Sequence, residues 1–102
     1  LCVIISMMNS KNAYLIGIKG AGMAGLAQIL KNQGYKVTGS DVKDKFFTDR
    51  ILKKTGIKYK EGFSIKNLPY QKDIRFISSD AYLIPKSKNP EIKKLSKIKN
   101  KP

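Results

Sequence analysis

The stretch Gly17-Ile18-Lys19-Gly20-Ala21-Gly22-Met23-Ala24-Gly25 decides the fold of this chain. It follows a short apolar run at residues 13–16 and opens into the segment 26–30. Residues 20–25 have the spacing G-x-G-x-x-G, between what we interpret as a buried strand and an amphipathic helix. This arrangement is typical of a phosphate-binding turn, because the N–H groups and positive dipole end of a helix start attract an anion.

Each glycine of this motif has an expected role. We expect Gly20 to permit a tight turn, and Gly22 to let backbone N–H groups approach a phosphate. We expect Gly25 to let the helix pack closely on the preceding strand. A glycine-rich turn with a purely conformational role is the alternative interpretation.

Asp41 supports a nucleotide-containing ligand. It lies 19 residues after Gly22, at the end of a second strand-like stretch. In dinucleotide-binding folds an acidic residue at this distance binds the ribose. A nicotinamide-dinucleotide-binding domain is therefore one possible function.

The chain is strongly basic. Its 21 Lys and Arg residues against 7 Asp and Glu residues give a formal net charge of +14. Such a charge suggests nucleic acid or an anionic membrane as a partner. Only two of these residues are Arg, the side chain best suited to phosphates and bases, and the lysines are scattered along the chain. We interpret the charge as a solvated basic surface, and keep a nucleic-acid-binding module as a further alternative.

The length of 102 residues corresponds to one domain. We expect residues 1–12 to be an N-terminal extension, with Met7 or Met8 as the natural start, and residues 13–102 to be the domain. The single cysteine, Cys2, fits a reducing compartment, and no window holds the ~18 apolar residues of a membrane span. We therefore expect a cytoplasmic protein without a membrane partner.

Strand-like and helix-like segments alternate along the chain. We expect strands at residues 13–18, 35–38, 57–59 and 73–79. The first helix should be closed by Gly34. The second should be capped by Asp44 or Thr48, closed by Gly56, and should turn Phe47, Ile51 and Leu52 inward. The third should begin at Asn89-Pro90-Glu91, with Asn89 as its cap and with Ile92 and Leu95 facing inward.

This alternation predicts an α/β fold with a Rossmann-like, doubly wound, mostly parallel sheet that is incomplete at its C-terminal end. Ligands of such sheets bind beyond the carboxyl ends of the strands. The glycine motif, the pair Ser40-Asp41 and the pair Ser78-Ser79 are all expected there.

The segment from Tyr14 to Ala27 resembles the opening of the Mur ligases. Further matches follow in the same order. They are Gly34-Tyr35-Lys36-Val37-Thr38-Gly39-Ser40-Asp41, Gly56-Ile57, Ser78-Ser79 and Asn89-Pro90-Glu91. The resemblance covers residues 13–102 and is closest to the members that add L-alanine to UDP-N-acetylmuramate. The related ligase that recycles muramyl tripeptide is the nearest alternative.

The resemblance implies that this stretch is the first of three domains and holds the UDP part of UDP-N-acetylmuramate. It implies that the backbone of Gly20, Ala21, Gly22 and Met23 cradles the diphosphate, that Ser40 and Asp41 lie near the uridine, and that Ser78 and Ser79 border the cleft. In the complete enzyme, ATP and Mg²⁺ would activate the muramoyl carboxylate as an acyl phosphate, which L-alanine attacks.

The catalytic parts of such an enzyme are not visible in this sequence. It contains no G-x-x-x-x-G-K-[ST] motif and no His. We therefore predict no catalytic or metal-binding residue and no cofactor in this chain, which should bind substrate without ligating it.

Four features depart from the family pattern. Lys19 stands where another glycine is usual, and we expect it to be either a solvated loop residue or a ligand of the diphosphate. Phe63 replaces a common histidine, and Asp80 adds a carboxylate after Ser79. Finally, the absence of a last strand should leave one sheet edge uncovered.

Overall fold

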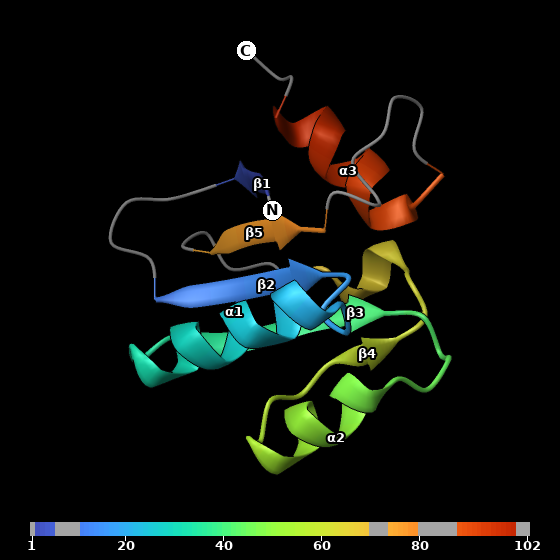
Figure 1. Cartoon of the computed structure of the whole chain (residues 1–102). Helices are drawn as coiled ribbons and strands as arrows, with labels where there is room; N and C mark the ends of the chain where they lie inside the picture. Colours follow the sequence, from blue (N-terminus) through green and yellow to red (C-terminus); the bar gives the residue numbers. More distant parts are fainter. Residues whose placement is uncertain (1, 6–10, 70–73, 80–87, 100–102) are drawn as a thin grey trace.

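A computed structural model of the chain describes residues 2–5, 11–69, 74–79 and 88–99 (Figure 1). Within these residues five strands form one sheet in the order β1-β5-β2-β3-β4. Their bounds are β1 Cys2–Ile5, β2 Asn12–Ile16, β3 Lys36–Asp41, β4 Lys60–Glu61 and β5 Arg75–Ser78. Strands β5, β2, β3 and β4 are parallel, and β1 is antiparallel to β5. The predicted mostly parallel α/β sheet is confirmed.

Helices cover both faces of this sheet. They are α1 Ala21–Asn32, α2 Phe47–Lys54, the 3-10 helix η1 Ile65–Asn67 and α3 Pro90–Lys99. Helices α1 and α2 pack side by side on one face, whereas α3 and η1 contact each other on the opposite face (Figure 1). The fold is therefore doubly wound and Rossmann-like.

Strand β2 forms the centre of two hydrophobic clusters, one on each face. Ala13 and Leu15 pack with buried residues of α1 and α2, namely Met23, Ala24, Ala27, Leu30 and Leu52. Tyr14 and Ile16 point the other way and pack with Ile74, Phe76, Ile92 and Leu95. This explains the uninterrupted apolar run of β2, because a strand covered on both faces has no solvent side.

Glycines end the first two helices, as the sequence predicts. Gly34 and Gly56 have positive φ values, 91° and 76°. Their N–H groups donate to Lys31 O and Lys53 O. In each case the next residue donates to the carbonyl five positions back, which completes a Schellman motif.

The prediction of a strand at residues 57–59 is wrong in position, because the strand lies at Lys60–Glu61. Pairing with β3 is confined to Lys60 and Glu61. The N–H of Ile57 already donates to Leu52 O in the cap of α2, so it is not available to the sheet. The other predicted strands form with shifted ends, and β3 extends through Gly39 and Ser40 to Asp41.

The predicted start and inner face of α2 also need correction. Its N-cap is Phe46, whose side chain makes no capping hydrogen bond, so neither Asp44 nor Thr48 caps the helix. Phe47 is 74% exposed, while Leu52 is buried as expected. A helix that begins at residue 47 turns Thr48 and Asp49 inward instead.

The start of α3 is confirmed. Asn89 Oδ1 accepts from the N–H groups of Glu91 and Ile92, and Pro90 occupies the first helical position. Ile92 and Leu95 are buried.

Strand β1 covers the edge of β5, so the prediction of an uncovered sheet edge is wrong there. Strand β1 consists of Cys2–Ile5, which we expected to belong to an N-terminal extension. These residues pair with β5, so the β5 edge has a hydrogen-bonding partner. Phe63 packs against the cluster around Tyr14. Asp80 lies outside the described residues.

Candidate functional site

The carboxyl ends of three strands meet at one edge of the sheet. Ile16 of β2 pairs with Ser40 of β3 on one side and with Ser78 of β5 on the other. The N–H groups of Gly17 and Ile18 donate to Ser40 O, and Ser79 N–H donates to Ile16 O. The three groups of predicted site residues therefore do come together.

The turn after β2 differs in detail from the expectation. Gly17, with φ of 84°, is the residue in the left-handed region. Gly20 has φ of −59° and ψ of 145°, which any residue adopts, so the role of tight-turn glycine belongs to Gly17. Gly20 N–H donates to Gly17 O and closes the turn.

The start of α1 has the features of a helix end that can bind an anion. Gly20 is the N-cap and provides no side-chain capping hydrogen bond, and the first turn carries no acidic residue. The first N–H groups of an α-helix have no acceptor within the helix, and they lie at its positive dipole end. Gly20, Ala21 and Gly22 are exposed, whereas the side chain of Met23 is buried in the core.

The space around each glycine shows which of them needs to lack a side chain. Among the residues that the structure describes, a Cβ at Gly22 or at Gly25 would meet no atom within 4 Å outside the backbone of its own helix. The prediction that Gly25 permits close helix–strand packing is therefore wrong. The close approach is at Gly39, where a Cβ would lie 2.3 Å from Leu15 O and 3.0 Å from Ile18 Cδ1.

Asp41 holds the glycine turn in place. Asp41 is 4% exposed. Oδ2 accepts from Lys19 N–H at 2.8 Å, and Oδ1 accepts from Val42 N–H at 2.7 Å. The carboxylate thus connects the turn to the end of β3, beside the site where a ribose is expected.

Ser40 and Ser78 are fully buried, and their hydroxyl groups bond within the protein. Ser40 Oγ donates to Glu91 Oε1 at 2.7 Å, and Ser78 Oγ donates to Ser79 O at 3.0 Å. Ser79 is half-buried. A contact of Ser40 with uridine would therefore involve its backbone.

Glu91 is the centre of a buried network that the sequence does not predict. The residue has no exposed surface, although the sequence pattern only places it at the start of a helix. Its carboxylate accepts four hydrogen bonds, from Tyr14 Oη at 2.8 Å, Ser40 Oγ at 2.7 Å, Ser64 N at 3.0 Å and Asn67 Nδ2 at 3.1 Å. Burial raises the pKa of Tyr14 well above its ordinary value, so its phenol stays protonated and donates.

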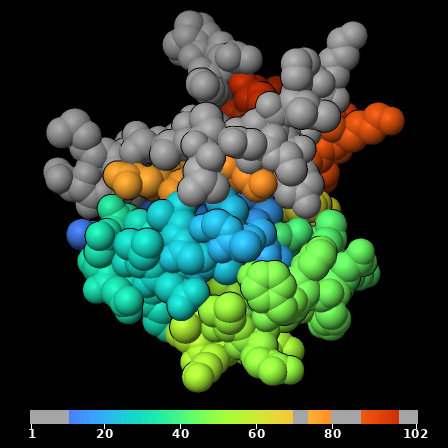
Figure 2. Space-filling model, in the orientation of Figure 1, coloured from blue at the N-terminus to red at the C-terminus, as the bar shows by residue number. Residues whose placement is uncertain are grey.

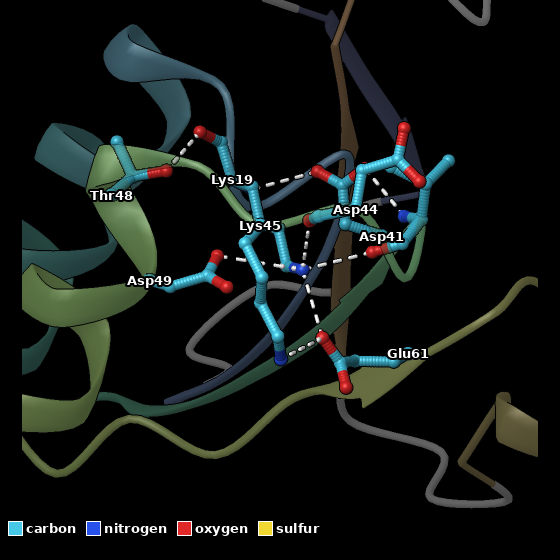
Figure 3. Close-up of polar contacts among 8 residues, drawn as sticks. Lys19, Asp41, Asp44, Lys45, Thr48, Asp49 and Glu61 are labelled. Atoms are coloured by element: carbon cyan, nitrogen blue, oxygen red, sulfur yellow. Dashed lines mark hydrogen bonds and ion pairs between the residues drawn. The ribbon is translucent and has the colours of Figure 1, made fainter.

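Lys19 is also placed differently from both expectations. The residue is 3% exposed, and its ammonium group points into a cluster of oxygen atoms beneath the glycine turn (Figure 3). Nζ donates to Val42 O at 2.9 Å, Asp44 O at 2.8 Å and Glu61 Oε2 at 3.0 Å, and lies 3.4 Å from Asp49 Oδ1. Its backbone O accepts from Thr48 Oγ1. It is neither solvated nor directed at the expected diphosphate.

The charges of this cluster stabilise one another. Burial alone lowers the pKa of Lys19, but the hydrogen bond with Glu61 and the charge of Asp49 outweigh it and raise the pKa above its ordinary value. Hydrogen bonds from Lys19 and Lys45 lower the pKa of Glu61. Lys19 is therefore a charged, buried lysine.

A cavity of about 740 Å³ lies beside the β3–β4 edge. Lys45, Lys53, Lys58 and Lys60 are among its lining residues, together with Tyr59 and Glu61. No residue of the glycine motif lines it.

In the part of the chain that the structure describes, no group of three or more His, Cys, Asp or Glu residues could hold a metal ion. The described helices include none that is both long and apolar enough to cross a membrane.

Comparison with known proteins agrees with this architecture. Residues 12–100 match the model of the Mur ligase family, catalytic domain. UDP-N-acetylmuramate–L-alanine ligase of Treponema pallidum (strain Nichols) is 47% identical over 70 residues, which are 69% of this chain and 14% of that protein. The enzyme of the same name from Psychrobacter arcticus is 40% identical over 87 residues, which are 85% of this chain and 17% of that protein.

A solved structure extends the similarity to three dimensions. The crystal structure of UDP-N-acetylmuramate:L-alanyl-gamma-D-glutamyl-meso-diaminopimelate ligase from Neisseria meningitides superposes with a TM-score of 0.71 at 27% sequence identity. The match covers 87% of this chain and 26% of that one. The chain therefore spans only a small part of the length of the proteins it matches.

Proposed function

The chain belongs to the Mur ligase family, and from this we propose that it is the nucleotide-binding part of a UDP-N-acetylmuramate–L-alanine ligase. In this proposal it binds the UDP end of UDP-N-acetylmuramate and does not join amino acids by itself. One observation carries the proposal above the others: the exposed residues Gly20, Ala21 and Gly22 form the uncapped start of α1, at the carboxyl edge of the parallel sheet. The relatives of that name, which act on UDP-N-acetylmuramate by their titles, support the choice of ligand.

The backbone N–H groups at residues 20–23 are the proposed contacts of the diphosphate. A helix start without a side-chain cap or an acidic residue favours an anion such as a phosphate group. Asp41 and the backbone of Ser40 are the proposed neighbours of the uridine, and Ser78 and Ser79 the proposed border of the cleft. The burial of the Ser40 and Ser78 side chains restricts their contribution to shape and backbone groups.

ATP and Mg²⁺ do not fit the residues present here. The sequence contains no P-loop motif, and the described residues hold no cluster of metal-ligating side chains. We therefore assign no step of the ligation to this chain, and keep ATP, Mg²⁺ and L-alanine as proposed partners of the complete enzyme. A cytoplasmic location belongs to the same proposal, and the single cysteine is compatible with a reducing compartment.

Calorimetric titration of the chain with UDP-N-acetylmuramate tests this proposal. We expect saturable binding of UDP-N-acetylmuramate, weaker binding of UDP and no binding of NADH. Binding of NADH without binding of either uridine ligand would contradict the proposal and favour a nicotinamide-dinucleotide-binding domain. Incubation of the chain with UDP-N-acetylmuramate, ATP, Mg²⁺ and L-alanine should yield no ADP above a blank without enzyme.

A further inference from the structure

Lys19 lies directly behind the glycine turn and has no hydrogen-bond donor left for a ligand. An ammonium group carries three N–H donors. The three acceptors within 3.0 Å are the carbonyl oxygens of Val42 and Asp44 and the carboxylate of Glu61 (Figure 3). Since only 1% of the side chain is exposed, any influence on a bound nucleotide must pass through these partners.

These partners belong to the segments around the expected nucleotide. Val42 and Asp44 lie in the loop between β3 and α2, and Glu61 ends β4. Two carbonyl oxygens that point at one buried position repel each other unless a cation lies between them. The ammonium group therefore holds these two loop carbonyls together.

The backbone of Lys19 attaches the glycine turn to the same loop. Its N–H donates to Asp41 Oδ2, and its carbonyl accepts from Thr48 Oγ1 at the start of α2. Thus one residue connects the glycine turn, the end of β3, the start of α2 and β4. Figure 2 shows the blue-to-cyan surface of the turn and α1 next to the green surface of α2, as these contacts require.

We propose that Lys19 is a positioning residue of the nucleotide site, whose ammonium group fixes the loop 42–46 against the glycine turn. This inference rests on the proposed function, in which the turn binds a diphosphate. The ion pair with Asp49 stabilises the fold, whereas the hydrogen bonds to the two loop carbonyls set the geometry of the site. The two contributions can be separated by mutation.

The decisive variant is the double substitution Lys19→Met with Asp49→Asn. It removes the cation together with the buried anion that would otherwise be left unpaired, so the fold should be retained. In this variant the carbonyl oxygens of Val42 and Asp44 still lose the ammonium group that donates to them. We expect a melting temperature close to that of the original chain and an affinity for UDP-N-acetylmuramate that is about 10- to 100-fold lower.

Lys43→Met is the matched control, because it removes one positive charge from an exposed position in the same loop. The double variant leaves the net charge unchanged, so an equal loss of affinity in the control would mean that any substitution near this loop weakens binding, which would overturn the inference. Full affinity in the double variant would overturn it as well. Lys19→Arg retains the charge beside Asp49 but not the geometry of the three donors, so it provides a second test if the double variant unfolds. We expect it to fold and to bind several-fold more weakly.

Hydrogen exchange distinguishes failure of this inference from failure of the proposed function. The N–H groups of Lys19, Val42 and Asp49 are hydrogen-bonded where the loop meets the turn and α2. In the double variant without ligand, these three should exchange at least about tenfold faster, while the N–H groups of β2 keep their protection. If the original chain fails to bind UDP-N-acetylmuramate, the proposed function is wrong, and the exchange rates still decide whether Lys19 orders the loop. Unchanged exchange at all three positions would contradict the inference.

Discussion

Gly22, like Gly25, has no steric reason among the described residues to lack a side chain. It lies in the first turn of α1, is exposed, and would accept a Cβ without any contact within 4 Å. Alanine is preferred over glycine in a helix by roughly 0.5–1 kcal/mol. A glycine at this position therefore costs some stability, which is consistent with a ligand that needs close access to the backbone.

This leads to a prediction in which stability and binding change in opposite directions. Gly22→Ala should raise the free energy of unfolding by up to about 1 kcal/mol and weaken UDP-N-acetylmuramate binding by about tenfold or more. Urea unfolding and calorimetric titration measure the two effects. Gly25→Ala is the matched control, since its Cβ also meets no atom within 4 Å. It should stabilise α1 similarly and leave the affinity unchanged. If Gly22→Ala binds as well as the control, the diphosphate does not contact this turn.

At the scale of elements, hydrogen bonds to the Glu91 carboxylate connect α3 and η1 with the sheet. Donors from β2, β3 and the segment at residues 64–67 converge on one carboxylate at the start of α3. A buried carboxylate is tolerated here because each oxygen atom accepts two hydrogen bonds. The same network holds Ser40, so α3 influences the carboxyl edge of β3 from the far side of the sheet.

We therefore expect Glu91→Gln to be destabilising although it preserves size. Either orientation of the amide directs an NH₂ group at two donors, for instance Ser64 N–H and the Asn67 amide. The free energy of unfolding should fall by about 1–3 kcal/mol, as measured by urea unfolding. Asp44→Asn, an exposed acid-to-amide change, should alter it by less than about 0.5 kcal/mol. Equal effects of the two substitutions would show that the network contributes little.

The ends of the elements show where local patterns are sufficient. The N-P-E sequence predicts the start of α3, and the glycines after α1 and α2 predict their ends, because the hydrogen bonds involved join residues within five positions. The start of α2 is not predicted, because it depends on contacts with Lys19, 29 residues from Thr48. Its inner face is therefore made of Thr48 and Asp49 rather than Phe47.

At the scale of the whole molecule, the net charge of +14 affects how the chain attracts anions. Lysines surround the cavity beside the β3–β4 edge and are exposed along α2 and α3. A diffuse positive field attracts any anion and is screened by salt, whereas a shaped site for a diphosphate relies on hydrogen bonds at short range. Salt dependence therefore distinguishes the proposed ligand from nucleic acid.

We predict that the affinity for UDP-N-acetylmuramate falls less than about tenfold between about 50 and 200 mM salt. Any binding of duplex DNA should fall by about 10³-fold or more over the same range if six or more phosphates are contacted. Titrations of both ligands at the two salt concentrations measure this. A steep decline for the UDP-sugar, parallel to that for DNA, would indicate binding by diffuse charge and contradict the proposed site.

By itself, the sequence determined the class of the fold, the family and the place of the candidate site. The alternation of apolar stripes and glycine stops requires parallel strands with helical connections, and parallel strands bring their carboxyl ends to one edge. Only the tertiary structure decided which side chains meet there. Tyr14 and Glu91 are 77 positions apart, and Lys19 and Glu61 are 42 apart. Local patterns record the period and the caps of each element, but the partner of a buried charge depends on the path of the whole chain. For this reason Lys19 and Glu91, which a sequence pattern places on a loop and at a helix end, are buried and hydrogen-bonded to residues distant in the sequence.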